Sequence, residues 1–118
     1  MNRNIGLYVK DILDSMENAE KFVEGMTYEE FKVDIKTSYA VTRCIEIIGE
    51  ASKNIPDSVR SKYPDIPWRE MAGMRDKVIH FYFGVNFMRV WLVVTEDIPK
   101  IKPLIQRVFL EINLPSSS

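Results

Sequence analysis

The segment MRDKVIHFYFG, residues 74–84, contains the side chains of this sequence that are best suited to chemistry on a phosphodiester. His80 is the only histidine, and its imidazole titrates near neutral pH, so it can act as a general acid or base. Arg75 carries a guanidinium that can bind a phosphate through parallel hydrogen bonds. Asp76 could orient the imidazole and favour its protonated form. These residue types suit RNA cleavage through the ribose 2′-hydroxyl, a scheme that requires no metal ion.

The spacing of these residues predicts that one chain does not complete the site. In a continuous helix, Arg75 and His80 would lie about 140° apart around the axis. Tyr82 would lie only about 20° from Arg75, and Asp76 about 40° from His80. We therefore expect the helix to pack beside its own copy about a two-fold axis, so that the arginine of one chain approaches the histidine of the other.

Each of these residues also has a purely structural interpretation. A histidine in the last turn of a helix interacts favourably with the helix dipole. Tyr82 could be a core or interface aromatic, and Arg75 could be an ordinary solvated surface charge. Taken alone, the residues therefore leave both interpretations open.

Two long helices are predicted in the first half of the chain. Apolar residues recur at steps of three and four from about residue 3, and Gly25 is a natural end for that helix. Thr27 and Glu30 form a capping box that starts a second helix, flanked by a hydrophobic staple of Met26 and Phe31. We expect this second helix to run to the residue before Pro56 and to pair with the first as an antiparallel hairpin.

The second half is predicted to contain further helices and no strands. The proline-rich connector IPDSVRSKYPDIPW should contain one short helix between Pro56 and Tyr63. A third helix is expected from Pro67 to near Gly84, with the histidine in its last turn. Asn86 can cap a fourth helix, which residue 99, a proline, should break or kink. A helical pattern then resumes around the proline at 103, and residues 113–118 should fray.

Composition indicates one ordinary globular domain, residues 1–118. The 118 residues carry a formal net charge of −1 and are 46% hydrophobic, which argues against a protein that coats nucleic acid and limits any RNA contact to a local site. The single cysteine, Cys44, excludes an internal disulfide and a cysteine-based zinc site. No signal sequence or stretch of about 20 apolar residues is present, so we expect a cytoplasmic protein that is not inserted in a membrane.

The pattern R-x4-H-x-Y, formed by Arg75, His80 and Tyr82 and followed by FGVNFMRVW, resembles the signature of HepT-like proteins in the HEPN superfamily. Similarity extends over most of the chain, including YVKDILDSMENAEKFVEG and RCIEIIGEASKNIPDSVRSKYPDIPWREMAGMRDKVIHFYFG. The resemblance implies an all-α fold, namely a HEPN-type antiparallel helical bundle with a four-helix core plus a short helix. It also implies a homodimer with the motif facing the dimer cleft.

The resemblance further implies a function. Similar proteins are toxins of type VII toxin–antitoxin pairs and act as metal-independent ribonucleases without a cofactor. Arg75 and His80 match the family's catalytic residues, Asp76 occupies a position that tends to be polar, and Tyr82 matches the tyrosine that receives AMP. The enzyme that transfers the AMP is the antitoxin, a nucleotidyltransferase of the MNT type. Phe81 departs from the small or polar residue common in the family, which leaves the choice of substrate open.

Other charged residues receive a structural interpretation from the sequence. Arg43, Glu46 and Glu50 could line the cleft, but the first two also have the spacing of an ordinary helical ion pair, and Gly49 could simply allow close helix packing. The cations most suited to guiding RNA are also typical of a solvated face, and we leave them out of the predicted site; they are Lys36, Lys77 and Arg89.

Two other function classes remain open at this point. The chain could be a non-catalytic helical module that binds a nucleotidyltransferase, an alternative that the near-neutral charge favours. It could also be a helical protein that binds a small ligand or nucleotide, for which only fold analogy speaks.

Overall fold

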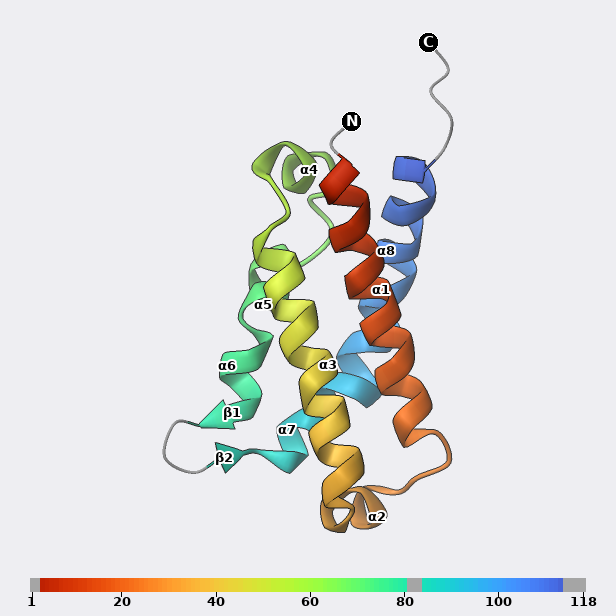
Figure 1. Cartoon of the computed structure of the whole chain (residues 1–118), viewed down its shortest axis with the longest axis vertical. Coiled ribbons are helices and arrows are strands. Elements are labelled where there is room, and N and C mark those ends of the chain that lie inside the picture. The colour runs from red at the N-terminus through yellow and green to blue at the C-terminus, as the bar shows by residue number, and fades with distance from the viewer. Residues whose placement is uncertain (1–2, 81–83, 114–118) are drawn as a thin grey trace.

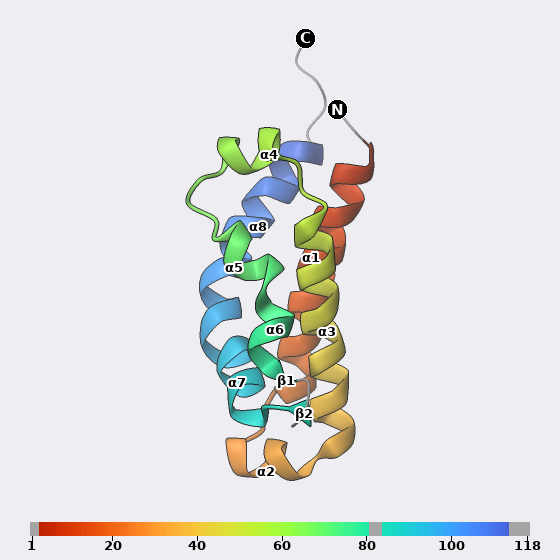
Figure 2. The same ribbon diagram turned by 90° about the vertical axis from the view of Figure 1, so that its left-hand side faces the viewer.

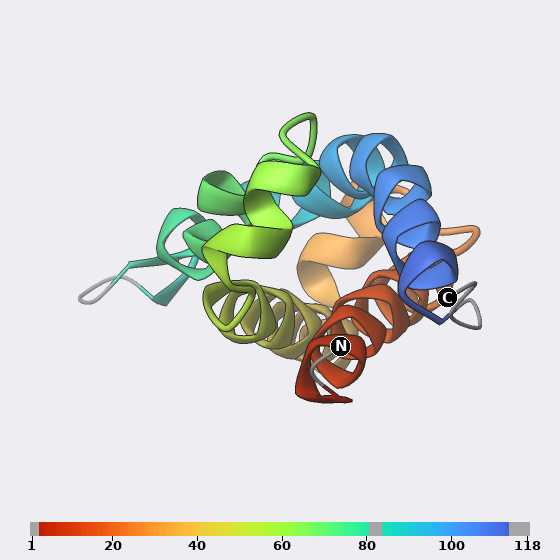
Figure 3. The same ribbon diagram turned by 90° about the horizontal axis from the view of Figure 1, so that it is seen from above.

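The computed structural model describes residues 3–80 and 84–113. Its helices form an elongated antiparallel bundle, in which α1 (Arg3–Val23) lies between α3 (Ile35–Lys53) and α8 (Ile98–Asn113), as Figure 1 shows. On its other side α3 contacts α5 (Trp68–Ala72) and α6 (Met74–Val78). Viewed from above, these helices surround one apolar core (Figure 3). The predicted all-α bundle is thereby confirmed.

Short helices close the two ends of the bundle. The segment α2 (Tyr28–Val33) lies at one end, and α4 (Asp57–Lys62) lies at the other, as the two side views agree (Figures 1 and 2). The predicted helix in the proline-rich connector corresponds to α4 and is confirmed. No helix among the described residues is both long enough and apolar enough to span a bilayer.

The predicted start of the second helix is confirmed, but its predicted length is wrong. Thr27 accepts the backbone N–H of Glu30, whose carboxylate in turn accepts the N–H of Thr27, so the capping box is complete. The helix then ends at Val33, because Asp34 leaves helical geometry and its carboxylate accepts the N–H of Thr37 at 3.0 Å. That hydrogen bond lowers the pKa of Asp34. An aspartate that captures a backbone N–H in this way ends one helix and begins the next.

The predicted third helix is also divided. Gly73 separates α5 from α6, and the chain becomes extended at Ile79, directly after Val78. Residues Ile79–His80 form β1, which pairs antiparallel with β2 (Gly84–Val85), and Gly84 adopts a positive φ of 75°. His80 therefore lies in a strand and not in the last turn of a helix, so the dipole interpretation of this residue is wrong. Consecutive β-branched residues and a glycine with positive φ favour the extended hairpin over a continued helix.

The last helical region follows its predicted start, and an irregular turn precedes Pro99, where a break or a kink is predicted. Asn86 accepts the N–H of Arg89 at 3.0 Å and so caps α7 (Phe87–Leu92), as expected. A π-helical turn, η1 (Val93–Asp97), leads directly into α8, which begins just before Pro99 and continues through Pro103. We attribute the π turn to Pro99, because its ring needs space next to the preceding turn and it cannot donate a backbone hydrogen bond.

Phe31 anchors α2 to the core. Its side chain is fully buried, and its ring centroid lies 5.3 Å from that of Trp91 on α7, which also contacts Tyr28. Val33, two residues further along the same helix, is 72% exposed. The two positions therefore form a matched pair of buried and exposed apolar residues.

We predict that Phe31→Ala lowers the free energy of unfolding by about 3–5 kcal/mol, because it leaves a cavity under α2. The control Val33→Ala should change it by less than about 0.5 kcal/mol. Urea denaturation followed by circular dichroism measures both. Equal effects of the two substitutions would contradict this description of the core.

Candidate functional site

The predicted site residues gather where α6 meets the small hairpin. Arg75 and Asp76 lie on α6 with exposed side chains, and the backbone of His80 ends β1. The position of the His80 imidazole, and Tyr82 as a whole, lie outside what the structure describes. In Figures 1 and 3, β1 and β2 project from the side of the bundle, away from α1 and α8.

Arg75 is oriented by an ion pair that the sequence did not reveal. Its Nε lies 3.3 Å from Oε2 of Glu46 on α3, and the two side chains are 55% and 28% exposed. The pair between Arg43 and Glu46 that their spacing suggested is therefore not the one formed; the guanidinium beside Glu46 belongs to α6. An exposed pair of this kind contributes at most about 1 kcal/mol, so a phosphate can displace Glu46 from Arg75 at little cost.

Gly49 lies where the end of α5 packs against α3. A Cβ atom at this position would lie 3.4 Å from the carbonyl oxygen of Ala72, at the end of α5. This agrees with the close-packing interpretation of Gly49. The contact places α5 and α6 directly against the α3 surface that carries Glu46.

Asp76 and His80 do not share one continuous helix, as their spacing had suggested, and Tyr82 lies outside the described residues. The helix ends at Val78, and Ile79 and His80 form a strand. A supporting role of Asp76 therefore stays a prediction without that geometric basis.

Asp76 lines a hollow of about 400 Å³ at the junction of α6 and α7, which we call the α6–α7 hollow. Its other lining residues are Lys77 from α6, Asn86 at the cap of α7 and Arg89 from α7. The hollow is held together by the backbone, since the N–H of Asn86 donates to the carbonyl of Val78 at 2.7 Å.

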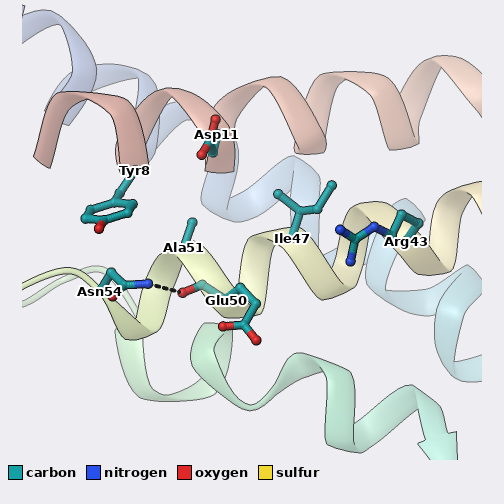
Figure 4. A pocket seen from close by; sticks show the side chains of 7 residues that line it. All are labelled: Tyr8, Asp11, Arg43, Ile47, Glu50, Ala51 and Asn54. Carbon is teal, nitrogen blue, oxygen red and sulfur yellow. Dashed lines mark hydrogen bonds between the residues drawn. The ribbon is translucent and has the colours of Figure 1, made fainter. Parts of the chain in front are cut away.

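A second hollow, of about 410 Å³, lies between α1 and α3, and we call it the α1–α3 hollow. Figure 4 shows its side chains, with Asn54 donating to the backbone carbonyl of Glu50 at 3.0 Å. Arg43 and Glu50, two residues considered above for the cleft, line this hollow together with Tyr8 and Asp11. Arg75 is not among its lining residues. Arg43 and Glu50 thus border the α1–α3 hollow, whereas neither Arg75 nor Glu46 is among its lining residues.

Other chemistries find no support among the described residues. Cys44 is buried, and burial raises the pKa of its thiol, so a reactive thiolate is disfavoured. Across residues 3–80 and 84–113, no cluster of three or more His, Cys, Asp or Glu side chains has the arrangement of a metal site. The polar groups beside the hairpin are thus the candidates for chemistry.

Comparison with known proteins gives a consistent result. The family model described as ribonuclease HepT-like matches residues 12–108. A protein of Thermococcus cleftensis, provisionally named a ribonuclease HepT, is 51% identical over 102 residues, covering 86% of this chain and 93% of that protein. Two proteins of Methanocaldococcus jannaschii, provisionally named RNases, are each 46% identical over 110 residues, covering 93% of this chain and 91% and 95% of their own lengths. No solved structure matches the chain.

We predict that Glu46→Gln and Arg75→Gln each change the free energy of unfolding by less than about 1 kcal/mol, because the pair is solvent-exposed. Urea denaturation of both single variants and the double variant measures this and the coupling between them. A loss above about 2 kcal/mol for either variant would show that the pair holds α6 to α3. Otherwise, loss of activity in an Arg75 variant can be interpreted as chemistry.

Proposed function

The chain belongs to the HepT-like ribonuclease family, and from that premise we propose that it is the toxin of a toxin–antitoxin pair and cleaves RNA at a site built by two copies. The observation that supports this most directly is the family match over residues 12–108. It is joined by relatives with ribonuclease names, to which the chain is similar over nearly their full lengths. The resemblance inferred from the sequence is thereby confirmed at the level of the family and the ribonuclease class.

In the proposed reaction, the groups beside the hairpin divide the work. Arg75 binds the phosphate and stabilises the negative charge that builds on it, after exchanging Glu46 for the substrate. One imidazole removes the proton of the ribose 2′-hydroxyl, and the resulting oxygen attacks the phosphorus. A second imidazole protonates the departing 5′-oxygen, which leaves a cyclic phosphate on the other product.

The requirement for two imidazoles is the reason to propose a homodimer. Each chain has one histidine, so an acid and a base of this type must come from two copies. His80 lies at the end of β1, in a hairpin that projects from the bundle, which is a suitable place for contact with a second copy (Figure 3).

We propose that an MNT-type nucleotidyltransferase antitoxin neutralises the toxin by transferring AMP to Tyr82. The tyrosine follows His80 by two residues, so the adduct would be attached close to the catalytic imidazole. Its phosphodiester would compete with RNA for Arg75, and its bulk would obstruct the substrate.

Expression without the antitoxin should arrest growth and degrade cellular RNA, whereas His80→Ala and Arg75→Ala should do neither while remaining folded. Growth curves, RNA electrophoresis and circular dichroism measure these outcomes. Lys53→Gln is the control, because it removes an exposed charge at the far end of α3, leaves Arg75, His80 and Glu46 intact, and should keep the activity. Equal toxicity of the wild type and both alanine variants would contradict the mechanism. Binding to the nucleotidyltransferase without any RNA cleavage would favour the alternative, a non-catalytic module that binds this partner.

Co-expression with the antitoxin should increase the intact mass of the toxin by one or more AMP units and abolish RNA cleavage. Tyr82→Phe should gain no mass, because it lacks the acceptor hydroxyl, and should remain toxic in the presence of the antitoxin. Mass spectrometry of the purified chain measures the modification. An unchanged mass accompanied by full neutralisation would show that the antitoxin acts by binding alone.

A further inference from the structure

We propose that the α6–α7 hollow binds a phosphate of the RNA strand next to the phosphate that is cleaved, an inference that rests on the proposed ribonuclease function. The hollow has a volume of about 400 Å³ and opens beside the hairpin that carries His80. Ligand-binding pockets begin at about 300 Å³, so the space suits one nucleotide unit. From the sequence, its two cations, Lys77 and Arg89, were expected on an ordinary solvated face.

The charges of the hollow are suited to a phosphodiester. Lys77 and Arg89 approach from different helices and line the same space. Within the described ranges neither of them forms an ion pair, although Asp76 lines the hollow with them. Two cations and one carboxylate leave one net positive charge, which matches the single negative charge of a phosphodiester.

Hydrogen-bond donors complete the match. The Oδ1 atom of Asn86 accepts the N–H of Arg89 at 3.0 Å, which leaves the NH₂ group of the same amide as a donor. Ammonium, guanidinium and amide groups can all donate to the oxygens of a phosphate. The hydrogen bond from Asn86 to the carbonyl of Val78 fixes the distance between the two helices that present these groups.

The position of the hollow indicates a neighbouring phosphate and not the one that reacts. On α6, Lys77 lies about 200° around the axis from Arg75, which faces Glu46 on α3. The hollow therefore lies on the side of α6 away from that ion pair, while β1 follows directly from the same helix. An RNA strand that has its cleaved phosphate at Arg75 could place an adjacent phosphate between Lys77 and Arg89.

The test uses the whole chain without AMP, as checked by its intact mass. Its binding to a fluorescent 2′-O-methyl oligonucleotide is measured, because this probe keeps the phosphates but lacks the attacking hydroxyl. Lys77→Gln and Arg89→Gln should each weaken binding for all sequences tested. Each should also reduce the slope of log Kd against log salt concentration by about 0.7, the value for one lost phosphate contact to a single strand. Lys53→Gln is the control, because it removes an exposed charge at the far end of α3.

The outcomes separate this inference from the proposed function. Weaker binding and a smaller salt slope in the Lys77 and Arg89 variants, with Lys53→Gln unchanged, support the hollow as a phosphate site. The phosphate site would be overturned if those two variants kept the affinity and salt slope of the wild type. It would also be overturned if all three variants lost affinity equally, or if the wild type did not bind the oligonucleotide. Cleavage of unmodified RNA by the wild type is measured in parallel. If the wild type cleaves RNA but the Lys77 and Arg89 variants bind as it does, only the hollow is refuted. If the two variants bind more weakly but the wild type cleaves no RNA, only the ribonuclease function is refuted.

Discussion

The hydrogen bond between the N–H of Asn86 and the carbonyl of Val78, at 2.7 Å, is the interaction on which the functional end of this protein depends. The last carbonyls of a helix lack partners within the helix, and here one of them is satisfied by the residue that caps the next helix. The bond ties the end of α6 to the start of α7 and closes the base of the β1–β2 hairpin. Arg75, the backbone of His80 and the cations of the α6–α7 hollow are all positioned relative to this one closure.

The surface of α3 that contacts α5 and α6 combines close packing with weak polar contacts. Gly49 allows α5 to approach until a Cβ atom would meet the carbonyl of Ala72, and one turn earlier Glu46 pairs with Arg75. The first contact is close, because a Cβ atom at this position would already be in van der Waals contact with backbone oxygen. The second is solvent-exposed and weak, which suits the proposed role of Arg75, in which a phosphate replaces the carboxylate.

The near-neutral net charge is compatible with binding a polyanion when the contacts are few and local. A chain with a formal net charge of −1 attracts RNA poorly as a whole, so affinity must come from cations gathered at one place. Lys77 and Arg89 gather because two short helices meet, although the residues stand twelve positions apart in the sequence. The same charge balance explains why composition alone also allowed a module that only binds protein.

Local sequence determined where several elements begin and which residues are proposed to carry the chemistry. The capping box of Thr27 and the cap at Asn86 satisfy backbone groups within a few residues, so their signals can be recognised without a fold. The R-x4-H-x-Y spacing likewise identifies the family from the order of the residues alone. Only the tertiary structure decided that Arg75 pairs with Glu46 and that Lys77 shares a hollow with Arg89. These outcomes depend on contacts between segments distant in the chain, and the helical periodicity of one segment contains no information about which partner its end will meet.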